Sequence, residues 1–261
     1  MNKFEHGPVF EQNEGLPHKT LGKVTVFRHG ETAYTNISPD LTKDGIRTIE
    51  DASKKLRDEL DASETLDSED IWVASSPAVR TKDTADIIKK HLGIDKTHVT
   101  DNLLGFQVEG NYDAVTEDIK DITKDAKTQE EHISMVDTAF SVGDERFKNK
   151  DVWGKNVDVH LKAPRGIEYL IRLFNKYEKK GTGKIPHLIL VSHYELIEKL
   201  VRDVYSINPK EERVFKPGER IDLVINKPEP GSSNVPIILT FRGVQKDVIF
   251  NRENRSIVVR N

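Results

Sequence analysis

The feature that most constrains the fold is an alternation of short apolar runs with amphipathic segments between about residues 23 and 205. The apolar runs have the length and β-branched content of buried strands and lie at about 23–28, 71–74, 97–100 (the weakest) and 188–191. The segments between and after them repeat apolar residues every three or four positions and lie at about 43–60, 77–92, 165–178 and 196–204. Strands that alternate with helices predict a mostly parallel sheet that is covered on both faces.

The remaining segments add three parts to this core. Residues 1–22 are polar and lack periodicity, which predicts an N-terminal extension before a domain at 23–261. Residues 111–152 carry more acidic than basic side chains, and their helical spacing predicts a helical insertion, about 111–163, packed over one edge of the sheet. From about residue 220 four short β runs follow. We therefore expect a three-layer α/β/α sandwich with a mostly parallel central sheet, a helical insertion and a C-terminal β-rich segment.

Composition narrows the classes of function. The formal net charge of −4 argues against a protein that binds nucleic-acid phosphates. The chain has no cysteine, which excludes disulfides, thiolate nucleophiles and cysteine metal sites. No apolar run approaches the length of a membrane span, and the N-terminus lacks the apolar core of a secretory signal. These observations predict a soluble, cytoplasmic protein with no nucleic-acid or membrane partner.

Arginine and histidine side chains follow three of the predicted strands. Arg28 and His29 end the first run, Arg80 comes shortly after the second, and His193 follows the fourth. Because the carboxyl ends of parallel strands lie at one edge of a sheet, these side chains are expected to converge around one anion. A guanidinium offers a fork of donors to phosphate, and an imidazole is neutral and nucleophilic near pH 7.

Two helix starts support this placement. Thr42 is suited to cap the helix that begins near residue 43. Ser76 is a natural N-cap and Pro77 suits the first helical position, so the next helix is predicted to begin there. Arg80 would then lie on its first turn, just beyond the end of a strand.

Four motifs occur in order at these predicted strand ends and helix starts. They are Arg28-His29-Gly30-Glu31-Thr32, then Leu41-Thr42-Lys43-Asp44-Gly45, then Ser75-Ser76-Pro77-Ala78-Val79-Arg80 with Thr84-Ala85, and finally Val191-Ser192-His193. Together they resemble the histidine phosphatase superfamily, the group that contains cofactor-dependent phosphoglycerate mutase. The resemblance spans roughly residues 23–205.

The resemblance implies that His29 becomes transiently phosphorylated while Arg28, Arg80 and His193 hold the phosphoryl oxygens. It implies a small phosphorylated substrate, no cofactor and no metal. Such chemistry depends on positioning and on fixed positive charge around an anionic group. Attack by an imidazole and then by water divides the displacement into two steps.

A general acid must protonate the leaving oxygen. The family often has a Glu shortly after the third strand, and the matching stretch here begins at Asp101. Aligning on Gly105 puts Asp101 at the acid position, whereas aligning on Glu109 and the glycine after it puts Asn102 there. Asp101 is preferred because an Asn side chain is no useful proton donor. Glu109 is the second candidate and Glu31 a weaker third.

The substrate-binding positions depart from the family pattern. The family's Asn six residues after the nucleophile is replaced by Thr35, with Asn36 next to it, and either is a candidate phosphate contact. The usual small residues after the second histidine are replaced by Tyr194 and Glu195. We expect the backbone N–H of Tyr194 to reach the phosphate and also place Glu109 among the substrate-binding residues.

Phosphomonoester hydrolysis through phosphohistidine is the leading hypothesis. One alternative is a mutase, which returns the phosphoryl group to its substrate. Another is a non-catalytic phosphate-binding module on the same fold, suggested by the departures at Thr35, Asp101 and Glu195. Metal-dependent hydrolysis by His29 and His193 lacks the required ligand spacing.

Overall fold

The computed structural model describes residues 19–32, 40–65, 67–101, 112–128, 131–132, 135, 139, 159–193, 198–208 and 214–260. Its strands are β1 (Thr20–Arg28), β2 (Glu69–Ser75), β3 (Val99–Thr100), β4 (Ile185–Ser192), β5 (Arg220–Asn226), β6 (Asn234–Phe241), β7 (Val244–Asn251) and β8 (Ser256–Val259). Its helices include α1 (Lys43–Ala62), α2 (Val79–Leu92), α3 (Tyr112–Thr123), α6 (Val159–Glu178) and α7 (Glu198–Tyr205).

One sheet runs through the molecule in the order β3-β2-β4-β1-β5-β6-β7-β8. The first four strands in this order are parallel, as the alternation of strands and helices predicts. The C-terminal β-rich segment is not a separate unit, because β5 pairs antiparallel with β1 and β6–β8 continue the same sheet. The sheet is thus parallel from β3 to β1 and antiparallel from β1 to β8, where β5–β8 follow one another directly along the chain.

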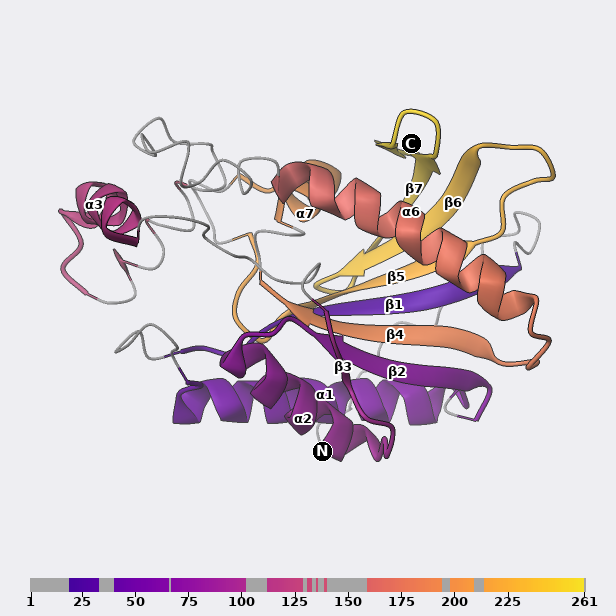
Figure 1. Ribbon diagram of the computed structural model, residues 1–261, viewed down its shortest axis with the longest axis horizontal. Helices are drawn as coiled ribbons and strands as arrows, with labels where there is room; N and C mark the ends of the chain where they lie inside the picture. Colours follow the sequence, from indigo (N-terminus) through magenta and orange to yellow (C-terminus); the bar gives the residue numbers. More distant parts are fainter. Residues whose placement is uncertain are drawn as a thin grey trace, which may run out of the picture.

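Helices cover both faces of the sheet, which confirms the predicted α/β/α layers (Figure 1). On one face, Ile49 and Leu56 of α1 and Ile88 of α2 pack in one core with Phe27 of β1. On the other face, residues of α6, α7 and the C-terminal strands pack against Val24. β1 contributes to both cores, so the strand before His29 is buried on its two faces.

Two helix starts differ from the prediction. The N-cap of α2 is Ala78, so the helix begins at Val79, and the prediction of Ser76 as N-cap and Pro77 as first helical residue is wrong. The reason is that Ser76, the residue after β2, is still hydrogen-bonded to β4, since its backbone N–H donates to the carbonyl of Val191 at 3.1 Å. Helix α6 begins at Val159 rather than near residue 165 and contains Pro164.

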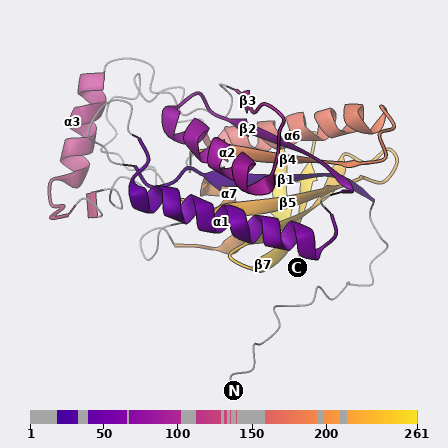
Figure 2. The same ribbon diagram turned by 90° about the horizontal axis from the view of Figure 1, so that it is seen from below.

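The predicted insertion is described mainly through α3. This helix lies apart from the sheet, beyond the carboxyl ends of the parallel strands, rather than over a lateral edge of the sheet (Figures 1 and 2). It ends at Thr123, earlier than the apolar spacing of the sequence suggests. The helical spacing in the second half of the insertion depends on Ile133, Val136, Phe140 and Phe147, which lie outside the described residues.

A buried ionic network crosses the amino ends of the parallel strands. Glu69 accepts from Lys23 Nζ at 2.5 Å and from His187 Nδ1 at 2.6 Å. Thr25 Oγ1 lies 2.9 Å from His187 Nε2 and donates to Asp222 Oδ1 at 2.7 Å. Burial alone raises the pKa of Glu69, but the hydrogen bonds from His187 and Lys23 outweigh burial, and the net pKa is below its ordinary value. Polar side chains therefore join β2, β4, β1 and β5 at the end opposite His29.

Candidate active site

The sheet register brings the predicted residues together. Arg28 is paired with Ser192 across β1 and β4, and the backbone N–H of His29 donates to the carbonyl of Ser192 at 3.1 Å. His193 is the next residue, so the two histidines leave adjacent parallel strands side by side. Their ring centroids are 5.2 Å apart, with an angle of 70° between the ring planes.

The guanidinium of Arg80 bridges the two imidazoles. Its Nε lies 3.2 Å from His29 Nε2, and its Nη2 lies 3.4 Å from His193 Nδ1. A guanidinium has donors and no acceptor, so each of these ring nitrogens presents its lone pair to Arg80. The other ring nitrogen of His29, Nδ1, lies 2.7 Å from the carbonyl oxygen of Gly30 and therefore carries the proton. His29 Nε2 is therefore the ring nitrogen without a proton.

The surroundings of His29 keep this imidazole neutral. Its side chain is buried, and burial is the largest cause of a pKa well below the ordinary value of histidine. Repulsion from His193, Arg80 and Arg28 lowers the pKa further, in that order, and the hydrogen bond to the Gly30 carbonyl opposes them. An unprotonated nitrogen is required for attack on phosphorus.

Arg28 is buried beside this pair and also binds the backbone of another segment. Its Nη1 donates to the carbonyl of Phe215, and its backbone N–H donates to the carbonyl of Glu219 at 3.0 Å. The backbone N–H of Gly218 donates to the Arg28 carbonyl at 3.2 Å. Arg28 thus ties the segment before β5 to the end of β1, a connection that nothing in the sequence indicates.

Two close contacts fix the turn after His29. A Cβ atom on Gly30 would lie 2.7 Å from the carbonyl oxygen of Gly45, and one on Gly45 would lie 2.3 Å from the carbonyl oxygen of Glu31. Thr42 donates its backbone N–H to that Glu31 carbonyl at 2.9 Å and caps α1 by accepting from the N–H of Gly45 at 2.9 Å. The motif at 41–45 therefore clamps the turn against the start of α1, and the predicted Thr42 cap is confirmed.

Thr84 connects the turn to the helix that carries Arg80. Its Oγ1 accepts from the backbone N–H of Gly30 at 3.3 Å and donates to the carbonyl of Arg80 at 2.8 Å. The sequence motif contains Thr84, but only the fold shows which two segments its hydroxyl joins.

Two of the candidate acids, Asp101 and Glu31, lie among the described residues. Asp101 follows β3, and its backbone N–H donates to the carbonyl of Ser75 at 2.9 Å. Strands β2 and β4 separate β3 from β1, so three strand spacings, roughly 14 Å, lie between β3 and β1. The Glu31 carboxylate accepts from Thr42 Oγ1 at 3.4 Å at the exposed rim of the turn. The predicted contacts Thr35, Asn36, Glu109 and Tyr194 lie outside the described residues.

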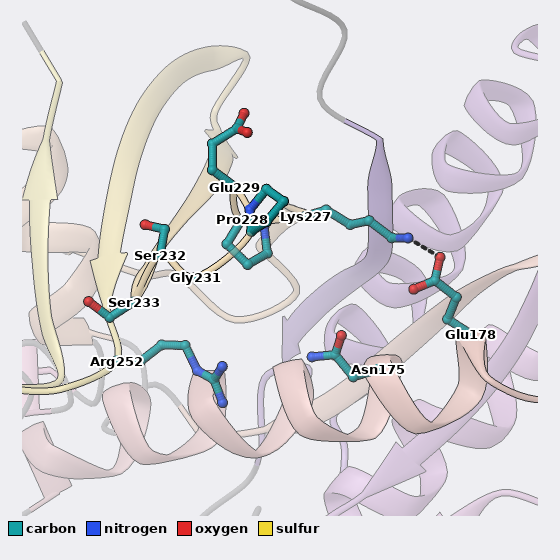
Figure 3. Close-up of a pocket in the computed structure, with 10 residues that line it drawn as sticks. Asn175, Glu178, Lys227, Pro228, Glu229, Gly231, Ser232, Ser233 and Arg252 are labelled. Carbon is teal, nitrogen blue, oxygen red and sulfur yellow. Dashed lines mark ion pairs between the residues drawn. The ribbon is translucent and has the colours of Figure 1, made fainter.

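A cavity of about 530 Å³ lies away from this site, between α6 and the connection from β5 to β6 (Figure 3). β5 is antiparallel to β1 with Asn226 paired to Thr20, so Lys227 in the cavity wall lies at the amino end of β1, opposite His29. Lys227 forms an ion pair there with Glu178 (Figure 3). None of the residues that line this cavity is a predicted site residue.

Neither a metal cluster nor a membrane span is found in the described part of the chain. No group of three or more His, Asp and Glu side chains among the described residues is arranged to hold a metal ion. No helix within the same residues is long and apolar enough to cross a bilayer.

One family model matches part of the chain. Residues 24–139 match the model of the histidine phosphatase superfamily, branch 1, a span that contains His29 and Arg80 and ends before His193. No curated protein sequence matches the chain.

Several solved structures have a similar fold. A protein described as mycobacterial hydrolase 1 is 14% identical, with 85% of this chain and 98% of that chain covered and a TM-score of 0.49. Mycobacterial glucosyl-3-phosphoglycerate phosphatase is 17% identical, with coverage of 84% and 97% and a TM-score of 0.48. Phosphoserine phosphatase from Entamoeba histolytica is 15% identical, with coverage of 78% and 90% and a TM-score of 0.42.

The lowered pKa of His29 predicts a pH-dependent stability. Below the unfolded pKa of histidine, near 6.5, the unfolded chain binds a proton at this position that the folded chain does not bind. Folding free energy is therefore lost as the pH falls from about 6.5 toward the folded pKa, by at most about 1.4 kcal/mol per pH unit. Urea unfolding at pH 7.5 and 5.0 should show a smaller loss in His29→Asn than in the parent. Equal losses would contradict the assigned environment of His29.

Proposed function

Because residues 24–139 place this chain in the histidine phosphatase superfamily, we propose that it hydrolyses small phosphomonoesters through a phosphohistidine on His29. Membership in this superfamily supports a phosphatase or mutase type of activity. The observation that carries the hydrolytic proposal is the contact of one guanidinium with the lone pairs of two buried imidazoles. That arrangement combines a neutral nucleophile with fixed positive charge at the point where an anionic phosphoryl group must bind.

In the first step, the lone pair of His29 Nε2 attacks phosphorus. A P–N bond forms, the P–O bond to the leaving group breaks, and the leaving oxygen takes a proton from a general acid. The N–H groups of Arg80 exchange their imidazole acceptors for phosphoryl oxygens. Arg28 and His193 are proposed to bind the same oxygens, with Thr35, Asn36 and the N–H of Tyr194 as further contacts.

In the second step, water attacks the phosphohistidine. A new P–O bond forms and the P–N bond breaks, so that inorganic phosphate leaves and the lone pair returns to His29 Nε2. The conjugate base of the general acid takes a proton from the attacking water, which restores the starting protonation state. Charge on the phosphoryl oxygens is balanced by side chains throughout, so the cycle needs no metal ion.

Asp101 is the proposed general acid and base. It follows the last strand of the parallel edge, and the segment directly after it, 102–110, carries Glu109, which is the alternative acid. Asp101 follows β3, on the flank of the sheet opposite the segment that Arg28 binds.

The replacement His29→Gln tests the nucleophile. The variant should release no phosphate from p-nitrophenyl phosphate and form no acid-labile phosphoenzyme, because an amide cannot form the phosphohistidine. The measurement is phosphate release together with acid-quenched labelling of the parent by a ³²P-labelled ester.

A separate experiment distinguishes the alternative functions by incubating the parent with 3-phosphoglycerate and a bisphosphate primer. Rapid isomerisation there would favour a mutase, and binding of phosphate analogues without turnover would favour a binding module.

The replacement Arg80→Ala tests the bridging guanidinium. It should lower kcat/KM by a factor of roughly one hundred, about 3 kcal/mol of transition-state stabilisation. Arg80→Lys should recover only part of this loss, because an ammonium is a point charge and cannot span both imidazoles as a planar fork does. Lys90→Ala, which removes an exposed cation from the last turn of the same helix, is the matched control. Equal activity of Arg80→Ala and Lys90→Ala would contradict the proposed role.

The replacement Asp101→Asn tests the general acid. Esters with poor leaving groups depend on protonation of the departing oxygen, whereas p-nitrophenolate leaves without it. The variant should therefore lose more kcat on alkyl phosphates than on p-nitrophenyl phosphate. Glu109→Gln provides the comparison, and a leaving-group dependence that appears in Glu109→Gln alone would move the role to Glu109.

A further inference from the structure

The buried hydroxyl of Ser76 lies beside the imidazole of His193. This serine follows β2 directly, and its side chain is fully buried. Its Oγ lies 3.1 Å from His193 Nε2 and 2.7 Å from Thr81 Oγ1. The backbone N–H of Ser76 donates to the carbonyl of Val191, two residues before His193, so the main chains of both residues are fixed by the same strand pair.

The directions of these hydrogen bonds follow from the groups at the two ends. Thr81 Oγ1 has one proton and lies 2.7 Å from the carbonyl of Ala78 and 2.9 Å from that of Ser76, which can only accept. Thr81 therefore accepts from the hydroxyl of Ser76. The Ser76 oxygen then faces His193 Nε2 as an acceptor, so Nε2 carries a proton.

The guanidinium leads to the same assignment from the other side of the ring. Arg80 Nη2 can only donate, so His193 Nδ1, at 3.4 Å, is the ring nitrogen without a proton. The chain of donors thus runs in one direction, from Arg80 through His193, Ser76 and Thr81 to a backbone carbonyl. His29 has the opposite tautomer, with its proton on Nδ1 and its lone pair on Nε2.

We propose that Ser76 is a positioning residue, which holds the His193 ring with its proton on Nε2 and its Nδ1 facing Arg80 and the phosphoryl site. Nothing in the sequence pattern suggests this role, since Ser76 resembles a helix cap there. The hydroxyl fixes both the tautomer and the orientation of the ring, because a ring turned by 180° would place Nε2 away from its acceptor.

The consequence for the reaction rests on the proposed function. To donate to a phosphoryl oxygen, His193 must take up a proton on Nδ1 from solvent when the dianionic ester binds. Ser76 accepts from Nε2 in both the neutral and the protonated ring, and this bond strengthens when the ring becomes cationic. His29 directly after β1 and Arg80 on α2 are basic groups that lie against the His193 ring, and Arg28 ends the strand paired with β4. The carboxylate of Asp101, the proposed general acid, follows β3, two strands away from β4. The basic groups disfavour the protonated ring, and the Ser76 acceptor opposes their effect.

Histidine ¹⁵N shifts of the resting protein test the tautomers without any variant of Ser76. Signals are assigned by their loss in His193→Gln and His29→Gln. We expect a protonated Nε2 in His193 and a protonated Nδ1 in His29. A His193 ring with its proton on Nδ1 would overturn the proposal, whether or not the protein hydrolyses esters.

Kinetics of Ser76→Ala test the consequence, with Ser75→Ala as the matched control. Ser75 is equally buried, but its hydroxyl donates to the carbonyl of Ser76 at 3.0 Å rather than to a ring. Ser76→Ala should lower kcat/KM on the order of tenfold or more and shift the alkaline limb of its pH profile to lower pH. Ser75→Ala should leave the position of that limb unchanged.

The outcomes separate this inference from the proposed function. Absence of phosphoenzyme and turnover in the parent would refute the hydrolytic function. The ¹⁵N test of the His193 tautomer does not depend on activity and would still decide the positioning role. An active parent whose pH profile is unchanged by Ser76→Ala, or shifted equally by Ser75→Ala, would refute the positioning role alone. If Ser76→Ala does not fold, Thr81→Val removes the acceptor of the Ser76 proton, and a pH profile identical to that of the parent would refute the one-directional chain.

Discussion

The contact of one guanidinium with two imidazole lone pairs is the constraint on which the rest of the site depends. Arg80 can donate to His29 Nε2 and His193 Nδ1 together only if the two rings leave adjacent parallel strands at the same height. A shift of one residue in the pairing of β1 with β4 would turn one ring to the opposite face of the sheet. The fold therefore supplies the register, and the hydrogen bonds at the strand ends select the nitrogen that faces the guanidinium.

The two ends of the parallel strands differ in their charged side chains: carboxylates with hydrogen-bond donors lie at the amino ends, and guanidinium groups and imidazoles lie at the carboxyl ends. At the amino ends, Glu69 and Asp222 accept from basic and hydroxyl groups, so each of these carboxylates has a partner there. At the carboxyl ends, Arg28, Arg80 and two imidazoles meet, and a backbone carbonyl and two ring nitrogens accept from the guanidinium groups. Two guanidinium groups beside two imidazoles favour an anionic ligand.

Much of this arrangement is predictable from the sequence, because it depends on strand ends. Short apolar runs followed by Arg28-His29 and by His193 predict both the parallel sheet and the edge where these residues meet. The role of Ser76 is not predictable in this way, because a serine before a proline has the same pattern whether it caps a helix or stays in the sheet. The Phe215 carbonyl that binds Arg28 is a backbone group, and no side-chain pattern reports its position. Contacts between segments distant in sequence are thus the part that only the structure supplies.

The resting arrangement also sets what substrate binding must change. With both rings neutral, the N–H groups of Arg80 have the two imidazole lone pairs as their acceptors, so Nε2 of the proposed nucleophile His29 is hydrogen-bonded at rest. A phosphoryl dianion is a stronger acceptor than a neutral ring nitrogen, because hydrogen bonds to charged groups are about twice as strong. In the proposed reaction, binding of the anion would therefore transfer the donors of Arg80 from nitrogen to oxygen and free His29 Nε2. An uncharged analogue of the same shape would not draw Arg80 away, so the proposed mechanism couples recognition of the anion to exposure of the nucleophile.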